Sequence, residues 1–96
     1  MDHQSAGPRS LKAEVRGRVQ GVGFRYFCMR EAARLNLTGW VRNMSDGSVQ
    51  SMATGSVSDL KEYVSALERG PRMAYVESVN VEWLTDPVAG SGFTVR

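Results

Sequence analysis

The sequence predicts an α+β fold, a split βαβ sandwich in which two helices cover one face of an antiparallel sheet. Three observations predict it. Residues 11–15 alternate between apolar and polar side chains, two later stretches repeat apolar residues at helical spacing, and a hairpin signal lies between these two stretches. The order is therefore strand, helix, two strands, helix, strand, with a short terminal strand. A chain of 96 residues is long enough for one domain with a single core.

The first strand and the first helix are predicted by a change in hydrophobic period. Leu11, Ala13 and Val15 alternate with charged residues, as in a half-buried strand. We expect Asn36 to adopt the left-handed conformation that ends the helix. The apolar stripe of this helix is formed by Phe24, Phe27, Cys28, Ala32 and Leu35.

A hairpin and a second helix follow. Residues 40–44 and 49–53 are extended runs on either side of Asp46-Gly47, which is a turn signal, and we predict that they form strands two and three. Ser56 and Asp59 have the spacing of a capping box at the start of the second helix, and Gly70-Pro71 ends it. The apolar positions of this helix are Val57, Leu60, Val64 and Leu67.

Two strands complete the predicted sheet. Val79, Val81 and Trp83 alternate with polar residues and predict a long strand. After a connection that contains proline, glycine and serine, Phe93 and Val95 alternate in the same way and predict a short terminal strand.

Composition restricts the compartment and the partners. The single cysteine, Cys28, excludes an internal disulfide framework and fits a reducing compartment. No stretch is long enough to span a membrane, and the polar start lacks the apolar region of a signal peptide. We therefore expect a cytoplasmic protein with no membrane partner and with a flexible tail over residues 1–8. His3, the only histidine, lies in that tail, and we do not expect it to be catalytic.

The segment from Gly17 to Arg25, GRVQGVGFR, is the strongest functional signal in the chain. Glycines allow successive backbone N–H groups to converge, and the start of a helix adds unpaired N–H donors and a partial positive charge. A cation such as Arg25 is mildly unfavourable at that end of a helix unless an anion is nearby. The segment therefore predicts an anion site, with phosphate as the expected group.

The chain lacks the motifs of nucleotide-binding, RNA-binding and metal-binding sites. The loop has neither the Gly-Lys-Ser/Thr ending of a P-loop nor the third glycine of a dinucleotide fingerprint. The basic and aromatic cluster of RNA-reading domains is missing from the central strands, and the net charge is only +2, so no nucleic-acid partner is expected. No Cys or His pair has metal-ligand spacing. Cys28 follows the loop closely, but it lies on the apolar stripe, and we interpret it as a small buried hydrophobic residue.

The residues from Arg16 to Arg25, the segment Gly39-Trp40-Val41-Arg42-Asn43, Asp46-Gly47 and the Gly70-Pro71 stop closely resemble the acylphosphatase family. The resemblance extends from Leu11 to Arg96 and implies a ferredoxin-like domain over residues 9–96. It implies that Arg25 binds the phosphoryl group and that Asn43 positions the attacking water. Asn36 departs from the glycine usual in the family, but asparagine can adopt the same left-handed conformation. The predicted phosphate-binding residues are Val19, Gln20, Gly21, Val22, Gly23, Phe24 and Arg25.

The chemistry of an acyl phosphate fits these residues. Its leaving carboxylate has a conjugate acid with a pKa of about 4, so no general acid is needed. Phosphoryl transfer has a loose transition state whose charge is spread over the equatorial oxygens, and fixed donors can stabilise it. Asn43 can orient water but accepts a proton poorly, so we expect the substrate's phosphate to take the proton. No metal or cofactor is expected.

Two alternatives remain open at this point. The loop could serve a non-enzymatic phosphate-binding or anion-binding module, which would not turn over an acyl phosphate. A similar domain could also act in carbamoyl transfer within a large maturation protein, but this chain shows no zinc-finger cysteines and no second domain. We interpret Arg16, Arg18 and Arg42 as solvated surface residues rather than site residues. The expected protein is a small monomeric hydrolase with an acyl phosphate as its small-molecule substrate.

Overall fold

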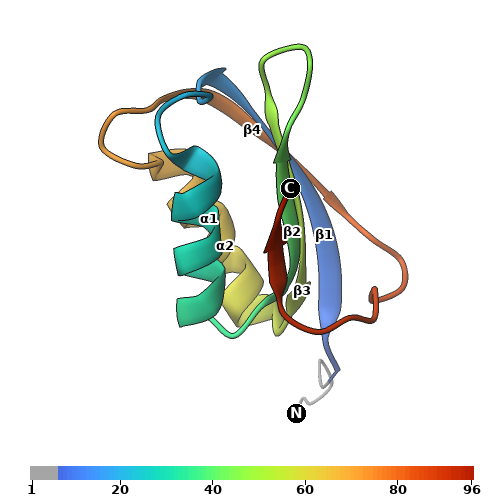
Figure 1. The fold of residues 1–96 in the computed structure, drawn as a ribbon. Coiled ribbons are helices and arrows are strands. Elements are labelled where there is room, and N and C mark those ends of the chain that lie inside the picture. Colours follow the sequence, from blue (N-terminus) through green and yellow to red (C-terminus); the bar gives the residue numbers. More distant parts are fainter. Residues whose placement is uncertain (1–6) are drawn as a thin grey trace.

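Two helices lie on one face of a five-stranded sheet in the computed structural model, which describes residues 7–96 (Figure 1). The strand order is β4-β1-β3-β2-β5. The first four strands pair antiparallel, and β5 runs parallel to β2. This arrangement confirms the predicted split βαβ, ferredoxin-like fold. The elements are β1 (Arg9–Arg18), α1 (Phe24–Arg34), β2 (Thr38–Asn43), β3 (Val49–Gly55), α2 (Val57–Arg69), β4 (Tyr75–Trp83) and β5 (Phe93–Val95).

The core lies between the sheet and the helices. Leu11 and Val15 of β1 are fully buried, as the period-2 pattern predicted, and they belong to one cluster with Phe24 of α1 and Leu60 of α2. Each such side chain stabilises the fold by about 1.5–3 kcal/mol through burial. The predicted stripe of α1 is buried along its whole length. The core therefore fixes the start of α1 against the sheet.

The end of α1 and the start of α2 have the predicted local structure. Asn36 has a φ of 56°, and its N–H donates to the Ala33 carbonyl at 3.2 Å. The N–H of Leu37 donates to the Ala32 carbonyl at 2.8 Å, which completes a Schellman motif. Ser56 Oγ accepts a hydrogen bond from the Asp59 N–H at 3.1 Å and caps α2.

Several predicted boundaries shift. The second strand is Thr38–Asn43 rather than residues 40–44, because the N–H of Met44 donates to the Ser48 carbonyl and Met44 thereby closes the turn. The third strand continues to Gly55 and β4 begins at Tyr75, where each finds a partner on β1. In α2 the predicted Leu60 and Leu67 are fully buried, Val64 is half-buried against the same core, and Tyr63 is a fully buried position that the pattern did not predict. Cross-strand pairing and packing, not the local pattern, set these limits.

The terminal strand runs along the outer edge of β2. Gly39 pairs with Phe93 and Val41 with Val95. The ring of Phe93 packs edge-on against Tyr63, with ring centroids 6.2 Å apart. This pairing carries the end of the sequence up to the start of α1 (Figure 1). Six residues of the predicted tail, including His3, lie outside the described residues.

Candidate active site

A hollow of about 280 Å³ lies where the loop after β1 enters α1. Its walls come from four segments that are distant in the sequence: this loop, the first turn of α1, the end of β2 and β5. The lining residues are Val19, Gly21, Gly23, Phe24, Arg25, Tyr26, Asn43 and Val95. The hollow thus brings the predicted anion loop together with the predicted water-positioning residue.

The loop presents backbone donors to this hollow. Gly21 and Gly23 have φ values of 74° and 78°, in the left-handed region that favours glycine. Within residues 7–96, the backbone N–H groups of residues 20–23 donate to no other residue. Gly23 caps α1 without a side-chain acceptor, so the first N–H groups of the helix lack a side-chain partner as well. Unpaired backbone donors at the start of a helix are suited to an anion.

Arg25 projects from the first turn of α1 and is only partly exposed. Its Nη1 donates a hydrogen bond of 2.7 Å to the main-chain oxygen of Arg96. No acidic residue lies in the first turn of α1, and among residues 7–96 no acidic side chain pairs with Arg25. One hydrogen bond leaves further N–H donors of the guanidinium available to an anion in the hollow.

Asn43 is the last residue of β2, and its side chain is exposed. Residue parity places Asn43 on the same face of the sheet as Val41, which is fully buried under the helices. Asn43 therefore points to the helix side, toward the loop and α1. Among the described residues its amide makes no hydrogen bond, so both its donor and its acceptor groups are free to hold a water molecule.

Two of the predicted loop residues do not line the hollow with their side chains. Gln20 Nε2 donates to the carbonyls of Met44 and Ser48 at 2.7 and 2.9 Å, and so ties the loop to the turn that follows Asn43. The side chain of Val22 packs against the core. At these two positions only the backbone N–H groups are left for the predicted binding of phosphate.

The other candidate side chains lie elsewhere. Arg16 pairs with Glu14 and Asp46, each at 3.2 Å, and Arg42 lies on the face of the sheet opposite Asn43. Arg18 is exposed at the end of β1. Cys28 is fully buried, and burial raises the pKa of its thiol to about 12. At neutral pH it is a protonated core residue, as interpreted from the sequence.

Sequence reasoning missed two residues of the hollow. Tyr26 is 61% exposed beside Arg25, and Val95 contributes from β5. An exposed aromatic side chain directly after Arg25 is a usable signal, because it lies outside the apolar stripe of α1. Val95 gave no such signal, since its position depends on the parallel pairing of β5 with β2.

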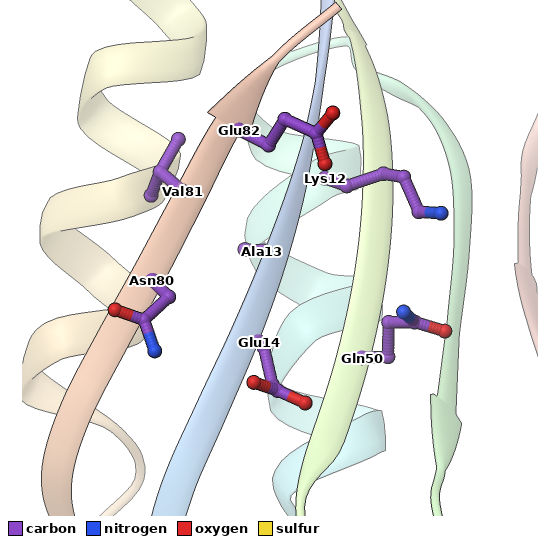
Figure 2. Close-up of a pocket in the computed structure, with 7 residues that line it drawn as sticks. All are labelled: Lys12, Ala13, Glu14, Gln50, Asn80, Val81 and Glu82. Carbon is purple, nitrogen blue, oxygen red and sulfur yellow. The ribbon is translucent and has the colours of Figure 1, made fainter.

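A second hollow lies on the open face of the sheet, away from the helices (Figure 2). Figure 2 shows the side chains of Lys12, Glu14, Gln50 and Glu82 projecting from neighbouring strands into this space. It offers two carboxylates and none of the backbone donors of the loop, so it is poorly suited to a phosphoryl group. Of the sequence-predicted site residues, none lines it.

Within residues 7–96, no group of three His, Cys, Asp or Glu side chains is arranged to hold a metal ion. No helix there has the length and apolar character needed to cross a membrane.

The fold and the hollow define a class of small α+β domains that carry a glycine-containing loop at the start of a helix. The acylphosphatase family model matches residues 11–95, and the chain belongs to this family. The chain is 50% identical over 88 residues to an acylphosphatase of Salinibacter ruber, covering 92% of this chain and 93% of the relative. It is 52% identical over 87 residues to an acylphosphatase of Pseudomonas paraeruginosa, covering 90% and 93%.

Comparison with solved structures supports the same family assignment. A solved acylphosphatase from Coxiella burnetii superposes with a TM-score of 0.90 at 35% identity and covers all of both chains. Family membership makes the protein an acylphosphatase-type acid-anhydride hydrolase, as predicted, rather than a non-enzymatic anion-binding module.

Proposed function

We propose that Arg25 and the backbone of residues 19–24 bind the phosphoryl group of an acyl phosphate, while Asn43 positions the water that attacks phosphorus. The observation that carries the proposal is the shared hollow, which unites the loop, Arg25 and Asn43 from separate elements. The products are a carboxylate and inorganic phosphate.

The division of labour follows from the transition state. Charge spread over the equatorial oxygens of a loose phosphoryl group is stabilised by donors that are already fixed in place. The N–H groups of the loop and the guanidinium of Arg25 supply such donors. The leaving carboxylate departs without protonation, because its conjugate acid has a pKa of about 4. A general acid is therefore unnecessary.

Asn43 has a different task. An amide orients water through its oxygen and its NH2 group but accepts a proton poorly. In this proposal the proton of the attacking water passes to a phosphate oxygen of the substrate. A series of substrates with different phosphate pKa values, measured in H2O and D2O, tests this step. Titration of a protein group as the general base would contradict it.

The activity itself is tested by hydrolysis of a synthetic acyl phosphate such as benzoyl phosphate. We expect turnover with inorganic phosphate as a competitive inhibitor, because product and substrate share the loop and Arg25. Turnover without competition by phosphate would contradict this assignment of the site.

The remaining expectations extend the same proposal. All proposed groups come from one chain, which supports a monomeric enzyme that needs neither metal nor cofactor. The single cysteine, buried as a thiol, supports a cytoplasmic location. Light scattering during size-exclusion chromatography tests the oligomeric state, and activity in excess EDTA tests the metal independence.

A further inference from the structure

Trp40 and Arg96 meet on the open face of the sheet. Trp40 is the third residue of β2, and its ring lies 4.7 Å from the guanidinium carbon of Arg96, which follows β5. Val41 and Asn43 face the helices, so Trp40, which directly precedes Val41, faces the opposite side of the sheet. The indole is therefore not part of the hollow that holds Arg25.

The main chain of Arg96 nevertheless contacts Arg25, which lines that hollow. Its N–H donates to the Val41 carbonyl at 2.8 Å, and its oxygen accepts from Arg25 Nη1 at 2.7 Å. Arg96 thus contacts Trp40 with its side chain and Arg25 with its backbone. A continuous set of contacts runs from the indole on one face of the sheet to the guanidinium on the other.

This connection matters because the acceptor of Arg25 lies on a weakly held segment. β5 has three residues and pairs with one neighbour, and a short terminal edge strand frays unless it is tied down. A cation over an indole ring is an attractive contact even at an exposed site. The stack on Trp40 is placed to hold Arg96, and Arg96 is placed to hold Arg25 in one rotamer.

We propose that Trp40 is a positioning residue of the enzyme, which fixes Arg25 through its stack with Arg96. The proposal rests on the proposed role of Arg25 in phosphoryl binding. It assigns no contact between Trp40 and substrate, so its effect is confined to steps that depend on Arg25.

The chain supplies a matched control in Arg42. Its guanidinium carbon lies 5.0 Å from the same ring, but its Nη2 and Nε donate to Gln50 Oε1 at 2.9 and 3.2 Å. Arg42 therefore shares the indole with Arg96, and within residues 7–96 none of its side-chain contacts leads to Arg25. Replacing it removes an equivalent stack without disturbing the acceptor of Arg25.

The test is a double-mutant cycle of Trp40→Leu and Arg96→Gln, with the inhibition constant of inorganic phosphate and kcat/KM for benzoyl phosphate as readouts. We expect each single variant to weaken phosphate inhibition about two- to fivefold, the range of an exposed cation–π contact. The double variant should lose no more than one single variant, because both break the same link. Trp40→Phe and Arg96→Lys should retain most of the inhibition, and Arg42→Gln should leave it unchanged.

Several outcomes would overturn the proposal. If the losses of phosphate inhibition multiply in the double variant, Trp40 and Arg96 act independently. An unchanged inhibition constant in Arg96→Gln would show that the side chain of Arg96 does not position Arg25. Arg96 is exposed, so we expect its variants to fold, and they test the proposal even if Trp40→Leu fails to fold. Arg25→Gln is measured alongside: if it leaves phosphate inhibition intact, the proposed role of Arg25 is wrong. If Arg25→Gln loses inhibition and Arg96→Gln does not, only the positioning role fails.

Discussion

Arg25, in the first turn of α1, and Asn43, the last residue of β2, line the same hollow although different elements carry them. One contributes a permanent positive charge and the other a neutral amide that is free among the described residues. A cation attracts the phosphoryl group in every state of the reaction, whereas an amide acts on water that is present only before attack. The roles of the two residues should therefore be distinguishable by experiment.

Replacing Arg25 by Gln should abolish turnover, with kcat reduced about 1000-fold or more, as for other cations that stabilise a transferring phosphoryl group. Phosphate inhibition should weaken as well, because the charge also binds the product. Arg25→Lys is the matched variant: it keeps the charge but loses the planar fork. Steady-state kinetics and phosphate titration measure both effects. A fully active Arg25→Gln enzyme would exclude the proposed role.

Replacing Asn43 by Ala should lower kcat about 100-fold or more, because the attacking water loses its orientation. The inhibition constant of phosphate should remain nearly unchanged, since the amide holds water rather than the anion. Asn80→Ala, on the open face of β4, is a control for the loss of an exposed strand amide. Equal loss of phosphate affinity in the Arg25 and Asn43 variants would contradict their separate roles.

The sequence predicted the local parts of this site because they depend on local chemistry. The left-handed Asn36, the Ser56 cap and the inward stripe of α1 are each decided within a few residues. The anion loop was recognisable for the same reason, since glycines next to a helix start act through their own backbone.

Long-range contacts could not be predicted in this way. Parity placed Val41 and Asn43 on one face, but only packing of the helices decides which face that is. The bond from Arg25 to Arg96 joins residues 71 positions apart and requires β5 to lie parallel to β2. Gln20 turns toward the Met44 carbonyl because of the hairpin, a contact without any sequence signal.

Gly23→Ala should destabilise the protein by about 1–2 kcal/mol, because an L-residue pays that cost in the left-handed region. Gly23 has a φ of 78°, and a Cβ there would meet no atom within 4 Å, so the cost comes from the backbone and not from a clash. Gly90→Ala, at an equally open position without a positive φ, should be neutral. Urea unfolding measures both. Equal stability of the two variants would exclude a conformational requirement at Gly23.

The last prediction concerns Cys28, whose pKa rises from 9.0 to about 12 because burial disfavours the thiolate. Tyr63, which is hydrogen-bonded to Ser51 at 2.9 Å, also has a raised pKa through burial. The unfolded chain therefore releases the Cys28 proton at lower pH than the native protein. The stabilising contribution of the native thiol is present in full below pH 9 and is lost as the pH rises toward 12.

Cys28→Ala removes this dependence, while Tyr63 keeps a raised pKa because burial is the main cause of its shift. The stability of the parent protein should fall, relative to Cys28→Ala, by about 1.4 kcal/mol for each pH unit above about 9. Urea unfolding of both proteins at about pH 8, 9.5 and 10.5 measures the difference, which should be constant below the transition and shrink or reverse above it. A difference that is independent of pH would contradict burial of a protonated thiol. At neutral pH the variant should keep its turnover of benzoyl phosphate, because a thiol with so high a pKa is not available as a nucleophile.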